Sequence, residues 1–237
     1  MMDVMAEAPA EVRSRLALPL DVGDLDAALA TARRIAPWFG IAKVGYELYG
    51  EAGPEAFARL HDLGFAVFAD LKLHDIPTTV ERGAAAVTRQ GVEYLNAHAA
   101  GGEEMLRAFV AGAARGADEA GLAAPVTLAV TVLTSDPDAS AFAARLAVAR
   151  AAGCSGVVCS GHELDQVQAA GLRSMVPGIR PAGVDHDDQA RVLTPGAATS
   201  AGADWLVIGR PVTQADDPAR AAAAIAAEVA SAIGATL

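Results

Sequence analysis

Short apolar runs alternate with alanine-rich stretches along almost the whole chain of 237 residues, and this alternation restricts the possible folds more than any other feature. Between the runs, apolar residues recur at intervals of three and four, which predicts amphipathic helices. We expect strands at residues 16–21, 41–45, 65–71, 94–98, 126–133, 156–160, 173–177 and 204–209. The clearest predicted helices cover residues 24–36, 54–64, 103–117 and 217–234.

Strands that are apolar on both faces and alternate with helices are typical of a parallel sheet covered by helices. Eight such units predict a single (β/α)8 barrel, the TIM barrel of the α/β class. A doubly wound open sheet is the alternative, but it usually carries a G-x-G-x-x-G turn, which the segment LDVGDLD (20–26) lacks. No linker or change of composition divides the chain. We therefore expect an N-terminal extension over residues 1–14 and one catalytic barrel domain over residues 15–237.

Composition limits the possible partners and the compartment. The net charge of −11 argues against a nucleic acid or an anionic membrane as partner, since both require a broad basic face. The N-terminus lacks the pattern of a signal peptide, and no apolar run is long enough to cross a membrane. Cys154 and Cys159 match no common zinc or redox spacing, so we interpret them as buried reduced thiols. Together these features indicate a cytoplasmic protein.

Charged side chains lie at or just beyond the end of the third predicted strand, at the edge where barrels of this class hold their active sites. The segment FAVFADLKLHDIPTT (65–79) places Asp70, Lys72 and Asp75 there, although a buried charge without a partner is costly. Asp70 and Lys72 are two residues apart, so a strand would point both into the barrel mouth. Lys43 ends the preceding strand, which predicts an array of alternating charges.

The choice of cation in this array is informative. Of the 18 Lys and Arg residues, 16 are arginines, and the two lysines are Lys43 and Lys72. Arginine holds its proton too tightly to act as an acid, whereas the pKa of a lysine can be tuned for proton donation. This pattern favours a catalytic array, and a structural network of ion pairs is the alternative.

The region after the last two predicted strands supplies candidate phosphate-binding residues. Arg180 follows the seventh strand in PGIRPAG, and Gly209 and Arg210 follow the eighth. Loops in these positions form the usual phosphate site of the barrel class. Glycine lets backbone N–H groups approach the phosphate oxygens, and arginine binds them with two hydrogen bonds. We therefore expect a small phosphorylated substrate that spans the mouth.

Several segments together resemble the orotidine 5′-phosphate decarboxylase family of the bacterial type. They are KVGYELYG, DLKLHDIPTTV, TVLTS, PGIRPAG and IGRPVTQADDP, and the resemblance extends in order from about Leu16 to Pro218. It implies that the chain converts orotidine 5′-phosphate to UMP and CO2, the last step of de novo pyrimidine synthesis. It also implies catalysis without cofactor or metal, and a homodimer.

The resemblance further implies a role for each matched residue. Lys72 would protonate C6, Asp70 would lie against the substrate carboxylate, and Asp75 would reach across the dimer into the partner's site. With Lys43 these are the implied catalytic residues. The implied substrate-binding residues are Asp21 and Lys43 near the ribose, Asp70, the segment Ile76, Pro77, Thr78 and Thr79, Thr134 and Gln189 near the pyrimidine, and Arg180, Gly209 and Arg210 on the phosphate.

Some residues depart from the pattern or lie beside it. Pro19 is unexpected in the first strand, and its missing backbone N–H predicts a bulge or a local break there. Asn96 shares a strand face with His98, and we expect it to brace the lysines. The five histidines give no metal geometry, so His74 and His98 near the mouth are interpreted as structural hydrogen-bonding groups.

Two other functions are weighed against this one. Mg²⁺-dependent sugar-phosphate decarboxylases of the same superfamily, such as 3-keto-L-gulonate 6-phosphate decarboxylase, share D-x-K-x-x-D but typically have an acidic metal ligand where this chain has Lys43. A lysine at that position repels a cation. A catalytically silent barrel that binds phosphonucleotides should have lost a member of the array, and none is missing.

Overall fold

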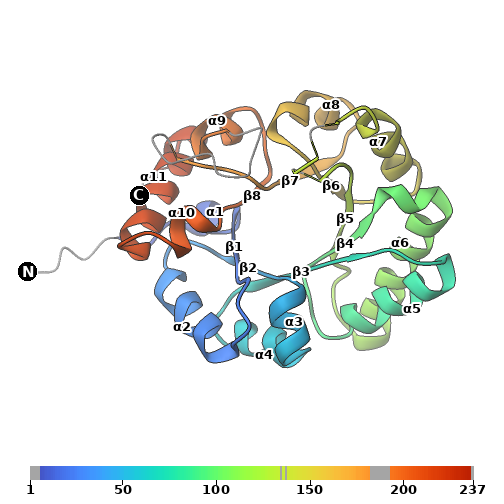
Figure 1. The fold of residues 1–237 in the computed structure, drawn as a ribbon, viewed down its shortest axis with the longest axis horizontal. Coiled ribbons are helices and arrows are strands. Elements are labelled where there is room, and N and C mark those ends of the chain that lie inside the picture. The colour runs from blue at the N-terminus through green and yellow to red at the C-terminus, as the bar shows by residue number, and fades with distance from the viewer. Residues whose placement is uncertain (1–5, 134, 137, 182–192, 236–237) are drawn as a thin grey trace, which may run out of the picture.

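Eight parallel strands form a closed barrel in sequence order, surrounded by helices, in the computed structural model of the protein (Figure 1). The structure describes residues 6–133, 135–136, 138–181 and 193–235. The strands are β1 (Leu16–Pro19), β2 (Ile41–Val44), β3 (Ala66–Leu73), β4 (Tyr94–His98), β5 (Val126–Val130), β6 (Gly156–Val158), β7 (Arg173–Val176) and β8 (Trp205–Val207). The helices are α1 (Ala10–Arg13), α2 (Leu25–Ile35), α3 (Tyr46–Ala52), α4 (Glu55–His61), α5 (Pro77–Thr88), α6 (Gly102–Ala120), α7 (Phe142–Ala151), α8 (Leu164–Ala169), α9 (Pro195–Ser200), α10 (Arg210–Thr213) and α11 (Pro218–Ile233), with short 3₁₀ helices η1 (Ala99–Gly101) and η2 (Gly161–Glu163).

The eight predicted strands are all present, and pairing of β8 with β1 closes the sheet. This closure confirms the (β/α)8 barrel and excludes the open doubly wound sheet. Most strands end slightly earlier than predicted. Val132 and Ile208 follow β5 and β8 and remain buried, so apolar character extends beyond the hydrogen-bonded ladder into the mouth. An apolar run therefore overestimates the length of a strand.

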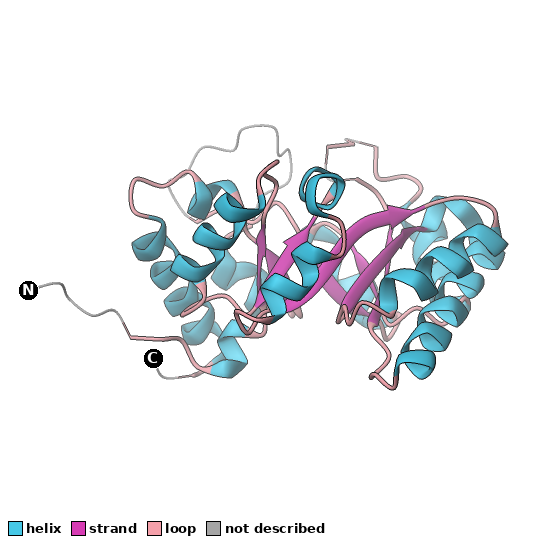
Figure 2. Cartoon of the chain, turned by 90° about the horizontal axis from the view of Figure 1, so that it is seen from below, coloured by secondary structure: helices cyan, strands magenta, loops and turns pink. Residues whose placement is uncertain are grey.

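Two apolar layers stabilise the barrel. The alternation of side chains along the strands creates these layers and also directs Asp70 into the barrel. Seen from the side, helices flank the strands (Figure 2). The inner layer, enclosed by the strands, contains Ala17, Ile41, Phe68, Leu128, Met175, Trp205 and Val207. On β3, Val67 and Ala69 belong instead to the larger layer between strands and helices. Since successive side chains alternate, Asp70 shares the inward face of Phe68.

Pro19 does not disturb the first strand. It is the last residue of β1, and the register with β2 continues through it, from Ala17 opposite Ile41 to Pro19 opposite Lys43. The predicted bulge or break is therefore wrong. The register of β1 with β8 ends at Ala17, so the missing N–H of Pro19 removes no ladder bond on that side. Its ring instead packs on Gly209, where an added Cβ would lie 2.7 Å from Pro19 Cγ.

The two cysteines are free and buried, as predicted. Burial raises the pKa of the Cys154 thiol to about 12 and also raises that of Cys159, so both thiols are protonated and inert at neutral pH. In the described ranges, no helix is both long enough and apolar enough to cross a membrane.

Helices α5 and α6 approach closely through two glycines. A Cβ at Gly112 would overlap the backbone carbonyl of Glu81, and one at Gly116 would overlap that of Ala85. Only glycine fits at either position. Helix α5 begins directly after the Asp75–Ile76 loop, so this packing positions the helix to which the loop connects.

We expect Gly112→Ala to lower the free energy of unfolding by about 1–3 kcal/mol, because the added methyl group forces α5 and α6 apart. Urea denaturation followed by circular dichroism would measure it. Gly50→Ala in α3 is the matched control, since its Cβ would contact nothing within 4 Å. The control should be neutral or stabilising by up to about 1 kcal/mol. Equal stability of the two variants would contradict this account of the packing.

Candidate active site

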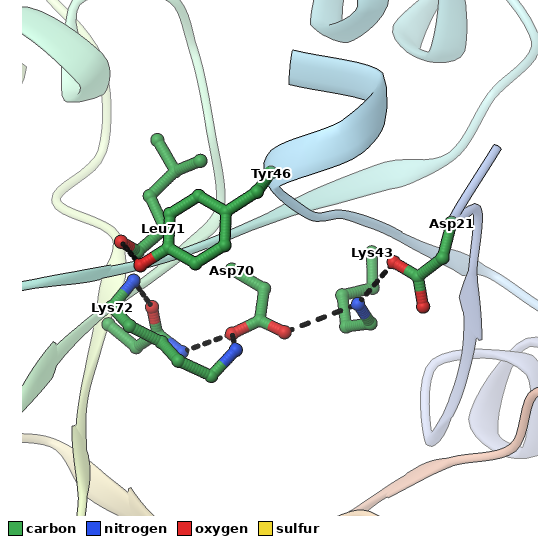
Figure 3. Close-up of polar contacts among 7 residues, drawn as sticks. Asp21, Lys43, Tyr46, Asp70, Leu71 and Lys72 are labelled. Atoms are coloured by element: carbon green, nitrogen blue, oxygen red, sulfur yellow. Dashed lines mark hydrogen bonds and ion pairs between the residues drawn. The ribbon is translucent and has the colours of Figure 1, made fainter. Parts of the chain in front are cut away.

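Polar side chains from neighbouring strands meet at the carboxyl end of the barrel (Figure 3). Lys43 lies on β2, Asp70 and Lys72 lie on β3, and Asp21 follows β1. Lys43 Nζ lies 2.9 Å from Asp21 Oδ1 and 3.2 Å from Asp70 Oδ2. Lys72 Nζ lies 2.7 Å from the other Asp70 oxygen, Oδ1. The structure thus brings together three of the four residues of the proposed array, with Asp70 bridging the two lysines.

Mutual pairing keeps this array charged although it is buried. Asp70 is 8% exposed and Lys43 is 9% exposed. Burial by itself acts to raise the pKa of Asp70, but Lys43, Lys72 and a hydrogen bond from Asn96 outweigh it and lower the pKa below its ordinary value. Burial likewise acts to lower the pKa of Lys43, and Asp70 and Asp21 outweigh it, so the pKa is raised. Both groups are therefore ionised at neutral pH.

Lys72 lies on an irregular part of β3. Its φ is 45°, and no other non-glycine residue in the described ranges has a positive φ. The left-handed region costs an ordinary residue about 1–2 kcal/mol. The register with β4 shifts at the same point, because Ala69 lies opposite Leu95 whereas Leu73 lies opposite Ala97. A bulge of this kind re-aims side chains, so Lys72 is not oriented by regular strand alternation as the sequence alone suggested.

A cavity of about 150 Å³ opens onto Lys43, Asp70 and Lys72. Its apolar walls come from Phe68, Val130, Val132, Val158, Pro177 and Val207. Charges act more strongly across such a poorly polarisable space than they do in water. The arrangement can therefore place a positive charge beside a substrate atom on which negative charge develops.

A second cavity, of about 230 Å³, is lined by Asp21, Gly209, Arg210 and Gln214, among others. Asp21 joins it to the first cavity through the ion pair with Lys43. The two residues predicted to bind phosphate after β8 therefore lie next to the array. Gln214 was not predicted as a site residue, although it falls within the segment IGRPVTQADDP, four residues after Arg210.

The other predicted ligands are more dispersed. Arg180 follows β7 and is buried, and its Nη1 donates to the carbonyl of Ile179 at 3.1 Å. Thr134 and Gln189 lie outside the described residues. Pro77 begins α5, and Thr78 and Thr79 follow it on exposed positions of the first turn.

Asp75 stands apart from the array within one chain. Its side chain is exposed, and its Oδ1 accepts a hydrogen bond from the backbone N–H of Ile76 at 2.6 Å. The described part of a single chain gives Asp75 no ion pair. Ile76 beside it is 66% exposed, which is unusual for an isoleucine.

Two further residues contact the site. Asn96 on β4 is fully buried and hydrogen-bonds both Asp70 and the backbone of Lys72. Tyr46, the first residue of α3, donates its hydroxyl hydrogen to the carbonyl of Leu71 at 2.9 Å. Sequence reasoning singled out Asn96 but missed Tyr46. The available signal for Tyr46 was its position three residues after Lys43 in KVGYELYG.

The histidines near the mouth form a pair. The rings of His74 and His98 lie 5.6 Å apart. Burial, His74, Lys72 and Arg145 lower the pKa of His98, so its neutral form is favoured. The described residues contain no group of three His, Cys, Asp or Glu side chains that could hold a metal ion.

A closed barrel with buried lysine and aspartate side chains at its carboxyl end is typical of (β/α)8-barrel enzymes. The model of the orotidine 5′-phosphate decarboxylase / HUMPS family matches residues 14–225. The chain belongs to this family, and the enzyme class predicted from the sequence is confirmed.

Individual proteins agree with this assignment. The chain is 46% identical over 235 residues to orotidine 5′-phosphate decarboxylase of Nitratidesulfovibrio vulgaris (strain DP4), covering 92% of this chain and 98% of that protein. It is 45% identical to the enzyme of that name from Moorella thermoacetica, covering 92% of each. The crystal structure of orotidine 5′-phosphate decarboxylase from Lactobacillus acidophilus is similar with a TM-score of 0.77 and 32% identity, over 91% of this chain and 99% of that one.

Asp70 should make protein stability depend on pH in acid. Since folding lowers its pKa from the ordinary 3.8, the stability it contributes is fully present above that value and is lost as pH falls through the folded-state pKa. We expect Asp70→Asn to lower the free energy of unfolding by about 3 kcal/mol at pH 7, because the two lysines lose their shared partner. The difference in free energy of unfolding between Asp70→Asn and the unsubstituted protein should become smaller below pH 3.8.

Urea unfolding at a series of pH values from 7 to below 3.8 measures this difference. Asp118→Asn, at an exposed position of α6, is the control, and its free energy of unfolding should stay close to that of the unsubstituted protein across the series. A constant difference between Asp70→Asn and the unsubstituted protein across the series would show that ionisation of Asp70 is not its source.

Proposed function

We propose that this protein decarboxylates orotidine 5′-phosphate to UMP and CO2, the last step of de novo pyrimidine synthesis. The observation that carries the proposal is the bridge from Lys43 through Asp70 to Lys72, buried beside a cavity lined by Arg210, in a chain of this family. We further propose that these side chains perform the chemistry without a cofactor or metal.

Loss of CO2 from C6 of the pyrimidine leaves an electron pair in the plane of the ring, where the π-system cannot delocalise it. The enzyme must then stabilise the carbanion electrostatically. The ammonium group of Lys72 lies on the first cavity, among apolar walls that exclude water and strengthen its field. Lys72 is thus the cation beside C6 and the acid that afterwards protonates it.

Asp70 has two effects on the same reaction. It keeps Lys72 in place through the 2.7 Å ion pair. It also faces the substrate carboxylate, so that departure of neutral CO2 relieves a repulsion between two negative groups. Asp21 and Lys43 bind the ribose, where their own ion pair joins the two cavities.

Phosphate binding supplies energy at a distance from the reacting atom. Gly209 and Arg210 line the second cavity with Gln214 and bind the phosphate, assisted by Arg180 after β7. This binding energy orders the site around the pyrimidine, to which Thr134 and Gln189 are assigned. The segment from Ile76 to Thr79 extends the binding surface beside the array.

The direct test follows the loss of orotidine 5′-phosphate absorbance with purified protein in excess EDTA. We expect conversion to UMP to continue under chelation. Lys72→Ala should lose turnover by at least about 10⁴-fold, because both the field and the proton donor are gone, while UMP binding persists. Near-normal turnover of Lys72→Ala would contradict the assigned mechanism. Activity found only on a keto-sugar phosphate with Mg²⁺ would contradict the assigned substrate.

We also propose that the enzyme is a homodimer in which Asp75 completes the partner's site. Asp75 and Ile76 are exposed, and a hollow of about 530 Å³ beside Lys72 is lined by Tyr46, Asp75 and Thr79. A second chain placed there would bury the apolar side chains and bring a carboxylate toward the lysine. The array would then alternate in sign along its whole length, which lowers the repulsion between like charges.

Mixing two inactive variants tests this arrangement. Lys72→Ala and Asp75→Asn should each be nearly inactive as purified homodimers. After refolding together in equal amounts, about half of the dimers are mixed, and each mixed dimer holds one intact site and one doubly altered site. About a quarter of the original activity should return. No recovery in dimers shown to have exchanged subunits would exclude a shared site.

A further inference from the structure

The peptide group that joins Leu71 to Lys72 is held at both ends by side chains (Figure 3). Its carbonyl oxygen accepts a hydrogen bond from the Tyr46 hydroxyl at 2.9 Å. Its N–H donates to Asn96 Oδ1 at 2.7 Å. We infer that Tyr46 and Asn96 are positioning residues, which clamp this peptide and thereby orient the Lys72 side chain for proton transfer. The inference rests on the proposed function of Lys72.

The local backbone requires such a clamp. Between Ala69 and Leu73 the register with β4 shifts, so the intervening peptide lacks its place in the regular ladder. Backbone polar groups away from water need other partners. Lys72 also has a φ of 45°, a conformation that a residue with a side chain keeps only when its surroundings enforce it. Two side-chain hydrogen bonds replace the missing strand contacts and enforce it.

The direction of the two bonds makes the clamp effective. In a trans peptide the C=O and N–H point to opposite sides, so Tyr46 from α3 and Asn96 from β4 hold the group from opposite directions. Rotation of the peptide plane would break both bonds together. The plane contains the N–Cα bond of Lys72, so fixing the plane restrains the bond that leads to the side chain, and the φ of 45° then sets the direction in which the side chain leaves.

Asn96 links the backbone of Lys72 to its ammonium group. While Oδ1 accepts from the Lys72 N–H, Nδ2 donates to Asp70 Oδ1 at 2.7 Å. The same Asp70 oxygen accepts from Lys72 Nζ at 2.7 Å. A backbone N–H can only donate and a carboxylate can only accept, so one orientation of the amide satisfies both partners. A single rigid group of a fully buried residue thus sets both ends of the Lys72 side chain.

Tyr46 offers the cleaner variant, because it lies outside the buried core and its hydroxyl can be removed without opening a cavity there. We expect Tyr46→Phe to lower kcat about tenfold and to change KM for orotidine 5′-phosphate less than twofold, since a misaimed donor slows chemistry more than it weakens binding. Tyr49→Phe is the matched control. Tyr49 lies on the same helix and stacks on Phe57, with ring centroids 5.5 Å apart, and its variant should keep the original kcat.

Asn96 gives a second, independent measurement. Asn96→Asp preserves size and the oxygen toward the Lys72 N–H, but it sets a second carboxylate against Asp70. We expect a loss of kcat of about a hundredfold and a changed pH profile of kcat, because the acidity of the array is altered. If this variant does not fold, Tyr46→Phe alone decides the question. If it folds, the double variant Tyr46→Phe with Asn96→Asp should show a smaller fold-reduction in kcat than the product of the two single reductions. The reason is that both side chains act on the same peptide group.

The outcomes separate this inference from the proposed function. An unsubstituted protein that does not convert orotidine 5′-phosphate would overturn both. An active protein in which Tyr46→Phe and Tyr49→Phe have the same kcat would overturn the clamp and leave the proposed function standing. A fall in kcat that matches a loss of folded protein by circular dichroism would likewise assign Tyr46 a purely structural role and overturn the inference.

Discussion

The carboxylate of Asp70, shared between Lys43 and Lys72, is the interaction on which the rest of the site depends. Two ammonium groups in an apolar cavity would repel each other, and burial by itself would favour loss of the Lys43 proton. The buried carboxylate removes both problems, and Asp21 extends the pairing on the side of Lys43. In the proposed mechanism, the carboxylate that stabilises the empty site also faces the negatively charged substrate. One side chain would then affect both the stability of the free enzyme and the reactivity of the bound substrate.

The barrel supplies this arrangement through ordinary strand geometry up to a point. Alternation turns Phe68 and Asp70 to the same inward face, and parallel strands bring Lys43 to the same end of the barrel. Beyond Asp70 the regular pattern stops. The register shift toward β4 and the left-handed Lys72 belong to a local structure that the fold class does not dictate.

This division explains what could be predicted from the sequence. The eight strands, the barrel and the proximity of Lys43, Asp70 and Lys72 follow from periodicity and from residue types at strand ends, which are local properties. The bulge depends on how β3 pairs with β4, and the Tyr46 contact depends on where α3 places a hydroxyl group, so neither is visible in a single segment. Pro19 is the opposite case, in which the sequence predicted an irregularity that the structure does not contain. A general rule about proline predicted a break, but the position of Pro19 at the end of the β1 ladder made the rule irrelevant.

Magnitudes show why a strained backbone at Lys72 is compatible with a functional enzyme. The left-handed conformation costs about 1–2 kcal/mol of stability. A hundredfold loss of rate from a misplaced donor corresponds to about 2.7 kcal/mol in the transition state. In a regular strand, alternation alone would set the direction of the Lys72 side chain. The bulge instead lets Asn96 contact the backbone of Lys72 and the carboxylate that holds its ammonium group. In the proposed mechanism, where Lys72 delivers a proton to one atom, a small loss of folding stability is thus exchanged for a larger gain in orientation.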